Sequence, residues 1–319
     1  MEIENSTNVS NTVISNDRTV FRYTEYLQLI VGVIGVIGNA CVFVLVCKIK
    51  LLHTIPNMFI ANLAMADMIA SFCILAKLVD ISFAVPKNIN MSLYCKLVRS
   101  DFFFWMSADA SILTLIGVTI ERYCAIVYPF RYHASFTNMK AYMLIASVWI
   151  LAVFLAIPLA NSYDSMDNYC VIVYDSKTKK LFIMIFFVTY LLPLISMILA
   201  YTNMFKRIGL STSDRPADAA TISSRRRLLK MLSIVVTVFF VCWSPNQWLY
   251  FLSNLGVQAD YTATYYQITV LMCLSNSSIN PIIYALKSKQ FKHAFLSLIH
   301  RGNVIDHEGS VVATTHELI

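Results

Sequence analysis

The chain has little of the charge that a water-exposed surface requires. Only 13% of its 319 residues are Asp, Glu, Lys or Arg, whereas soluble domains carry about 25%. It has only eight glycines and eight prolines, which argues against a collagen-like or a disordered chain. Hydrophobic residues make up 58% of the sequence, and the mean hydropathy is +0.64. These proportions indicate an integral membrane protein.

The hydrophobic residues gather into seven long runs, and a helix of about 20 residues crosses a bilayer core. Five runs lack Asp, Glu, Lys and Arg, and the other two hold one acid each, Asp67 and Asp109. The runs are 27–47, 58–76, 102–120, 141–163, 181–205, 231–259 and 261–286. They do not alternate as barrel strands do. The sequence therefore predicts an all-α, seven-transmembrane-helix bundle over residues 27–286, without the internal repeat common in transporters.

The basic residues orient this bundle. Fifteen of the 25 Lys and Arg residues flank one set of loops or follow the last helix, whereas eight lie on the opposite face. The basic excess belongs in the cytoplasm. We therefore expect a plasma-membrane protein with an extracellular N-terminal tail, 1–26, and a cytoplasmic tail, 301–319. The net charge of +7 then reflects topology and contact with a lipid bilayer, and nucleic acid is not an expected partner.

Two features of the outer face suggest covalent modification. The sequons at Asn5 and Asn8 predict a glycoprotein. Of the eight cysteines, only Cys95 and Cys170 fall on this oxidising side. A disulfide between them is the simplest interpretation, and two free thiols are the alternative.

Each predicted helix carries a short polar or proline motif. The motifs are Gly38-Asn39-Ala40, Asn62-Leu63-Ala64-Met65-Ala66-Asp67, Glu121-Arg122-Tyr123, Trp149, Pro193 with Tyr201, Phe239-Phe240-Val241-Cys242-Trp243-Ser244-Pro245 and Asn280-Pro281-Ile282-Ile283-Tyr284. In this order and spacing the chain resembles the rhodopsin-like (class A) G-protein-coupled receptors. The resemblance implies a receptor and signal transducer rather than an enzyme, one that activates a heterotrimeric G protein.

Burying a carboxylate such as that of Asp67 in the middle of a membrane costs free energy, so Asp67 is expected to face polar partners. The other polar residues in the middle of predicted helices include Asn39, Ser111, Asn276, Ser277 and Asn280. Together they could form a hydrated cluster around the carboxylate. In the family the matching residues bind sodium, so the resemblance implies an allosteric sodium ion, held first by Asp67, Ser111 and Asn280. A purely structural hydrogen-bond network is the alternative, and no other cofactor is expected.

The resemblance also implies an activation switch. Glu121 is expected to hold Arg122 at rest, and outward movement of the sixth helix about Pro245 would open a cleft for the G protein. The full set of switch residues is Glu121, Arg122, Tyr123, Tyr201, Trp243, Pro245, Pro281 and Tyr284. Segment 287–300 has the apolar spacing of an amphipathic helix on the inner membrane surface. The tail beyond it carries hydroxyl residues that would suit arrestin as a further partner.

The ligand is predicted from exclusions and from one loop. Phe104 stands where amine receptors carry Asp, and 261–286 lacks the Lys that opsins need. The β-branched and aromatic residues around Cys170 predict a hairpin, which is typical of the family's peptide receptors. We therefore expect a peptide, and a neuropeptide first; a non-peptide small molecule or, in another class, a transporter are the alternatives. The candidate pocket comprises Lys77, Asp101, Phe104, Trp105, Asn246, Gln247 and Tyr250.

Two features depart from the family pattern. The spacing from Cys95 to Arg122 is two residues longer than usual, so the outer part of the third helix is expected to be bulged or shifted. Asp109 is an unusual intramembrane carboxylate, which either pairs with Lys77 or is neutral and hydrogen-bonded.

Overall fold

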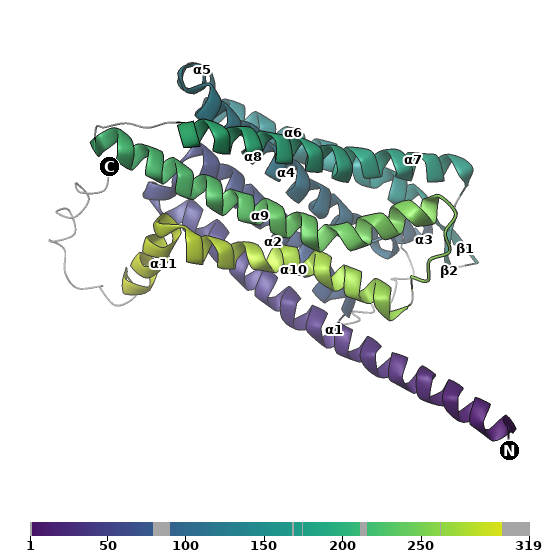
Figure 1. Ribbon diagram of the computed structural model, residues 1–319. Helices are drawn as coiled ribbons and strands as arrows, with labels where there is room; N and C mark the ends of the chain where they lie inside the picture. Colours follow the sequence, from purple (N-terminus) through teal and green to yellow (C-terminus); the bar gives the residue numbers. More distant parts are fainter. Residues whose placement is uncertain are drawn as a thin grey trace.

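The computed structural model describes residues 2–78, 90–167, 169–173, 175–210, 216–261 and 263–301. Within these residues, seven helical segments are long and apolar enough to cross a membrane. They are Tyr23–Lys48, Ile55–Lys77, Met91–Val127, Asn138–Asn161, Ser176–Leu210, Ile222–Asn254 and Thr264–Lys287. The segments run side by side as one bundle (Figure 1). The predicted all-α, multi-pass architecture is therefore confirmed.

The first, second and seventh spans form one side of the bundle. Helix α1 (Glu2–Lys48) packs chiefly against α2 (Ile55–Leu78) and α10 (Thr264–Lys287). Its N-terminal part extends beyond the rest of the bundle (Figure 1), and only the part from Tyr23 counts as a span. The side chains of Asn5 and Asn8 lie outside the described side chains, so the glycosylation sites and the boundary at residue 27 stay predictions.

The third span is broken near its outer end. Helix α3 (Met91–Tyr94) continues into a π-helical turn, η2 (Cys95–Arg99), and α4 (Phe102–Val127) begins after Asp101. Asp101 has a φ of 56°, a left-handed conformation that interrupts a helix. A π turn and one left-handed residue thus accommodate the longer spacing between Cys95 and Arg122. The predicted bulge is confirmed.

The fifth span contains a second π-helical turn. It consists of α7 (Ser176–Phe186), η3 (Phe187–Leu191) and α8 (Leu192–Leu210). The turn directly precedes Pro193, whose nitrogen cannot donate to the preceding helical turn. Tyr190 lies in this turn, and its hydroxyl is 2.6 Å from Ser244 Oγ on α9 (Pro216–Asn254). The π turn therefore supports a polar contact between the fifth and sixth spans.

The sixth span ends earlier than its hydrophobic run predicts. Helix α9 stops at Asn254, whereas the run continues to residue 259. Gly256 has a φ of 102°; its N–H bonds to Ser253 O at 3.0 Å, and Val257 N bonds to Leu252 O at 3.1 Å. This pair of bonds is the Schellman motif, which glycine permits after a helix end. The prediction that this run is helical to its end is therefore wrong.

The loop after α6 (Asn138–Asn161) forms the predicted hairpin. Strands β1 (Tyr163–Met166) and β2 (Tyr169–Ile172) pair antiparallel, with Ser165 opposite Cys170. A disulfide joins Cys170 to Cys95 in η2, so the predicted bridge is confirmed. It ties the hairpin to the outer end of the third span.

Three short helices lie at the opposite end of the bundle. They are η1 (Lys50–Leu52), α5 (Pro129–Ser135) and α11 (Lys289–Arg301); α5 and α11 lie at the end away from the hairpin (Figure 1). In α11, Phe291 is buried and stacks on Tyr284, with ring centroids 5.6 Å apart, whereas Phe295 is exposed. The helix predicted after the last span is therefore present.

A glycine allows the close approach of α1, α2 and α10. A Cβ at Gly35 would clash with Ser71 Oγ and lie 2.8 Å from Ser278 Oγ. Gly35→Ala is therefore expected to lower stability by about 1–3 kcal/mol, the usual cost of overpacking. Gly209 in α8 is the matched control because a Cβ there has nothing within 4 Å. Thermal unfolding of the purified variants would measure both effects, and equal melting temperatures would contradict this account.

Candidate functional site

Asp67 lies in the middle of α2 and is 1% exposed. Its Oδ1 accepts hydrogen bonds from Ser111 Oγ and Ser277 Oγ, both at 3.0 Å, and its Oδ2 accepts one from Asn280 Nδ2 at 2.7 Å. Ser111 belongs to α4, and the other two donors belong to α10. Three helices thus converge on one buried carboxylate, as buried charge requires.

The same cluster holds amide oxygens without hydrogen-bond partners. Among the described residues, Asn39 Oδ1, Asn276 Oδ1 and Asn280 Oδ1 are buried and unpartnered, which is unusual for buried polar atoms. Asn39 Nδ2 is satisfied, since it donates at 2.9 Å to both Gly35 O and Ser277 O. Carboxylate, hydroxyl and amide oxygens are hard ligands, so this donor set fits a small, hard cation such as sodium.

A neighbouring network holds α2, α4 and α6 together. Trp149 Nε1 donates to Asn62 Oδ1 at 2.9 Å, and Asn62 Nδ2 donates to Thr114 Oγ1 at 2.7 Å. Asn62 and Trp149 belong to the sequence motifs, whereas Thr114 carries no such signal. This chain of bonds fixes the second span against the third and fourth beside Asp67.

At the end of the bundle where α5 lies, Glu121 is fully buried and accepts hydrogen bonds from two residues. Arg122 donates to both carboxylate oxygens through Nε and Nη2. Tyr132 in α5 donates its hydroxyl to Oε1 at 2.5 Å. Burial, and then the neighbouring Glu121, raise the pKa of Tyr132, so the hydroxyl stays protonated and able to donate. Sequence reasoning missed Tyr132 because it lies outside the motifs and the predicted spans.

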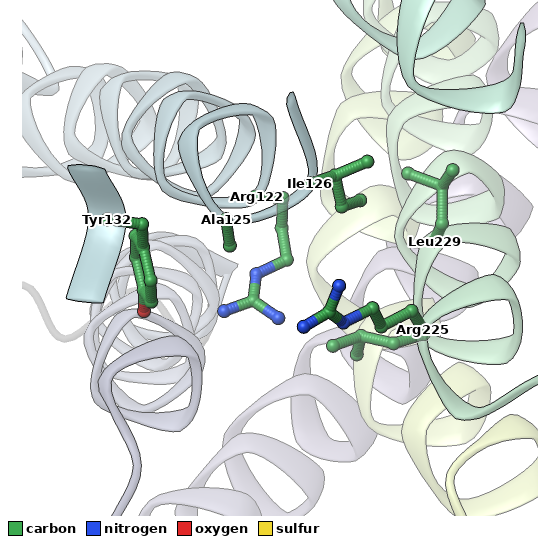
Figure 2. Close-up of a pocket in the computed structure, with 7 residues that line it drawn as sticks. Arg122, Ala125, Ile126, Tyr132, Arg225 and Leu229 are labelled. Atoms are coloured by element: carbon green, nitrogen blue, oxygen red, sulfur yellow. The ribbon is translucent and has the colours of Figure 1, made fainter. Parts of the chain in front are cut away.

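A cavity of about 160 Å³ opens beside this ion pair. Arg122, Tyr132, Arg225 and Leu229 are among its lining residues, and Figure 2 shows the guanidinium groups of Arg122 and Arg225 facing each other. Arg225 stands near the start of the sixth span, and among the residues whose side chains are described no second acid pairs with Arg122. Glu121 is the acid that pairs with Arg122 in the described structure.

The remaining switch residues lie on α4, α8, α9 and α10. Tyr201 and Tyr284 are buried, and the Tyr284 hydroxyl has no partner among the described residues. Tyr123 accepts a hydrogen bond from Asn203 Nδ2 at 3.0 Å. Pro245 and Pro281 lie inside α9 and α10, where each removes one helical hydrogen bond.

Weakening the Glu121–Arg122 pair is expected to raise signalling without ligand. Glu121→Gln replaces a charge-assisted contact with a neutral one, which is weaker by about 1 kcal/mol, and several-fold higher basal activity should follow. Tyr132→Phe removes one neutral-donor hydrogen bond and should give a smaller rise. Ligand-free nucleotide exchange at matched expression measures both, and Tyr128→Phe, in the same loop but without a described bond to Glu121, is the control. Basal activity at or below wild type in Glu121→Gln would contradict the assignment.

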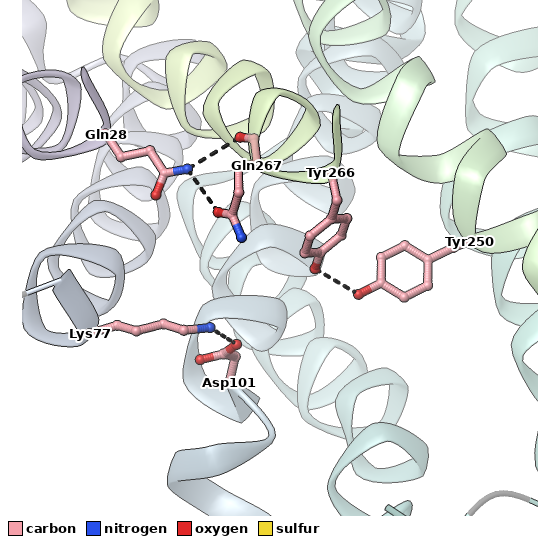
Figure 3. A network of polar contacts seen from close by, with 6 residues as sticks. All are labelled: Gln28, Lys77, Asp101, Tyr250, Tyr266 and Gln267. Carbon is pink, nitrogen blue, oxygen red and sulfur yellow. Dashed lines mark hydrogen bonds and ion pairs between the residues drawn. The ribbon is translucent and has the colours of Figure 1, made fainter. Parts of the chain in front are cut away.

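Toward the end of the bundle where the hairpin lies, three polar pairs lie close together, as Figure 3 shows. Lys77 Nζ and Asp101 Oδ2 form an ion pair at 2.6 Å. Gln28 Nε2 bonds to Gln267 O at 3.2 Å, and the hydroxyls of Tyr250 and Tyr266 are 3.2 Å apart. Lys77 therefore pairs with Asp101, and the alternative in which it pairs with Asp109 is not seen.

Apart from Lys77 and Asp101, the predicted pocket residues fall into two groups. Trp105, Gln247 and Tyr250 line a cavity between α4, α6, α7, η3 and α9, together with Asp109. By contrast, Phe104 packs against Ala70, Ile74 and Leu274, and Asn246 Nδ2 bonds to Thr269 Oγ1 at 3.0 Å. Phe104 and Asn246 thus lie in helix–helix contacts beside the cavity.

Trp243 links this cavity to the centre of the bundle. Its ring lies edge-to-face with Trp105 at 6.4 Å and 5.9 Å from Phe239. Trp243 is buried, and its Nε1 has no partner among the described residues. Trp243 immediately precedes Ser244, which contacts Tyr190, and Pro245 in the chain. A change at Trp105 therefore reaches, through Trp243, the segment of α9 that contains Pro245.

Comparison with known proteins gives the family. The sequence pattern of the 7 transmembrane receptor (rhodopsin family) matches residues 38–284. The allatostatin-A receptor of Bombyx mori is 28% identical over 89% of this chain and 81% of its own length. Galanin receptor 2b of Danio rerio is 32% identical over 83% and 72%, and the substance-P receptor of Canis lupus familiaris is 29% identical over 91% and 74%. The chain belongs to the rhodopsin family of seven-transmembrane receptors, and it is a receptor rather than an enzyme.

Proposed function

We propose that this protein is a plasma-membrane receptor for an extracellular peptide, most simply a neuropeptide, and that it activates a heterotrimeric G protein. The similarity to receptors named for allatostatin-A, galanin and substance P carries this proposal. The hairpin tied down by Cys95–Cys170 and the polar pairs of Figure 3 support it. A peptide offers amides and side chains for such polar groups, whereas a lipid ligand would favour a more apolar entrance.

The proposed orientation places the hairpin outside the cell. The basic excess lies in the loops and tail at the end of α5 and α11 (Figure 1), and such residues are retained in the cytoplasm. The N-terminal sequons at Asn5 and Asn8 would then be exported and glycosylated. The hydroxyl residues predicted to serve arrestin binding, Ser310, Thr314 and Thr315, lie outside the described residues.

Activation would proceed by outward movement of α9 about Pro245. The cytoplasmic cavity between Arg122 and Arg225 would widen, and Arg122 would exchange Glu121 for the terminal helix of the G protein. Tyr201 and Tyr284 would turn toward the same space. A ligand that reverses a 99:1 equilibrium needs about 5.5 kcal/mol of differential affinity, which the outer pocket would supply through contacts made only in the open state.

We further propose that Asp67 holds an allosteric sodium ion. Asp67, Ser111, Ser277, Asn39, Asn276 and Asn280 supply the oxygen atoms that would surround it. An ion bound there would neutralise the buried carboxylate and hold α2, α4 and α10 together, which favours the resting packing.

A panel of synthetic peptides tests the proposed function. Allatostatin-A, galanin and substance P, followed by a library of amidated peptides, would be applied to cells that express the chain with a G-protein readout. At least one peptide should evoke a saturable response that is absent from cells expressing Arg122→Ala. A response confined to non-peptide molecules would overturn the peptide assignment, and solute uptake without any G-protein response would indicate a transporter.

A further inference from the structure

Asp109 is a carboxylate that the mechanism above leaves unused. It lies on α4 one helical turn below Trp105, so both side chains face the cavity between α4, α6, α7 and α9. Among the described residues, no hydrogen bond or ion pair involves its carboxylate, so the hydrogen-bonded alternative expected from sequence is not seen either, and Lys77 is engaged by Asp101. Asp67, the other carboxylate in the middle of a span, accepts three hydrogen bonds. Two acids in one bundle thus have opposite surroundings.

An acid without a partner inside a membrane protein is costly and usually functional. Packing does not explain its presence, since leucine would occupy a similar volume without the desolvation cost. Of the polar pairs near the hairpin, the pair Tyr250–Tyr266 reaches this cavity through Tyr250, whose hydroxyl is 3.2 Å from that of Tyr266. A carboxylate kept in such a place needs a partner that arrives from outside the chain.

The walls around Asp109 favour a cation as that partner. Five aromatic residues line the cavity: Trp105, Phe182, Phe186, Tyr250 and Phe251. The rings of Phe186 and Phe251 stack at 4.4 Å, and Trp105 meets Tyr250 edge-to-face at 5.6 Å. Aromatic faces attract ammonium and guanidinium groups, more strongly where water is excluded. The carboxylate and the aromatic rings therefore both favour a cation in this cavity.

The size of the cavity limits what enters it. Its volume is about 80 Å³, well below the roughly 300–1,000 Å³ of sites that enclose a whole small molecule. A single side chain is the group that matches this volume. Gln247 lines the same cavity and adds an amide that can orient a planar cation.

We propose that Asp109 and its aromatic walls bind a cationic group of the ligand, the guanidinium or ammonium of one side chain. This proposal rests on the proposed peptide function, because it assigns one contact of that peptide. The cation would pair with the carboxylate beneath Trp105, and Trp105 touches Trp243. Binding at Asp109 would thus act directly on the packing beside Pro245.

A matched pair of small probes tests the site without an agonist. Benzamidinium is a planar aromatic cation, and benzamide is its neutral counterpart of nearly the same shape. Millimolar benzamidinium should raise the melting temperature of the purified, detergent-solubilised receptor by roughly 2 °C or more, whereas benzamide should leave it unchanged. Asp109→Asn should lose the benzamidinium shift. Asp175→Asn should keep it, because Asp175 is an exposed acid that caps α7 away from the cavity.

Each outcome bears on one claim. No shift with wild-type protein, equal shifts with both probes, or an undiminished shift in Asp109→Asn would overturn the cation site. A shift that depends on charge and on Asp109, together with a silent peptide panel, would retain the site and reject the peptide function. Once an active peptide is known, replacing its Arg or Lys residues one at a time with citrulline or norleucine should cost affinity at one position in wild type and much less in Asp109→Asn.

Discussion

Arg122→Ala is expected to abolish G-protein activation while leaving ligand affinity, measured without G protein, close to wild type. Arg122 lines the cavity beside Glu121, and its side chain is 14% exposed, so it is available to a docking helix. The cavity that holds Trp105 and Asp109, where the ligand is proposed to bind, is lined by other residues, so ligand contacts should remain. Because coupling between two sites is reciprocal, the variant should also lose the gain in agonist affinity that a bound G protein produces.

Nucleotide exchange on purified heterotrimers, with receptor in lipid discs, measures this effect. Arg227→Ala is the matched control, since Arg227 is an exposed arginine of α9 that does not line the cavity. The control should retain exchange. Normal exchange by Arg122→Ala at equal receptor concentration would show that the cavity beside Glu121 is not the docking site.

Asp67→Asn is expected to remove the effect of sodium on agonist affinity. In wild type, sodium should lower agonist affinity by a factor between about 5 and 150, the usual range of allosteric coupling. Asparagine keeps the shape of the side chain and one oxygen acceptor but lacks the charge that offsets the ion's lost hydration. Agonist binding would be measured in sodium and in choline at constant ionic strength.

Asp175→Asn is the control for this measurement because it removes an equal charge outside the membrane. It should stay as sensitive to sodium as wild type. Equal sodium sensitivity in Asp67→Asn and wild type would reject the site and leave the cluster as a structural hydrogen-bond network.

The spans could be predicted from sequence because the bilayer imposes one simple requirement on each of them. Lengths near 20 apolar residues appear in every run, and the structure has a membrane-length helix at each. The end of α9 could not be predicted from hydropathy because apolar residues continue past Gly256. The helix stops where Gly256 N and Val257 N bond to Ser253 O and Leu252 O. Hydropathy identifies the segments that lie in the membrane, whereas local backbone hydrogen bonds determine where each helix ends.

The sites were predictable to different degrees. Polar residues in mid-membrane are rare and must find one another, so the partners Ser111, Ser277 and Asn280 of Asp67 could be named in advance. The outer pocket depends on the break at Asp101, which sets the direction of every side chain after it. Sequence could indicate that the segment was bulged and could name Trp105 as a residue that lines the cavity, but it could not show that Phe104 packs between helices instead.

The contact between Tyr132 and Glu121 could not be predicted from the sequence. Tyr132 donates to Glu121 from a short helix in a loop, and neither its spacing nor its residue type marks it. Only the folded arrangement brings the loop back onto the end of α4. Contacts between a span and a loop of this kind are decided by tertiary packing rather than by any local pattern.

The distance between the N-terminal ends of α6 and α9 measures the proposed outward movement of α9 most directly. Spin labels would be attached through unnatural amino acids at Lys140 and Arg227, which are both exposed, so that the native cysteines are untouched. With an active peptide and nucleotide-free G protein, the distance distribution should gain a longer component that is absent without them. It should also be absent when the peptide is applied with excess GTP. An unchanged distribution in a sample that catalyses nucleotide exchange would contradict outward movement of α9.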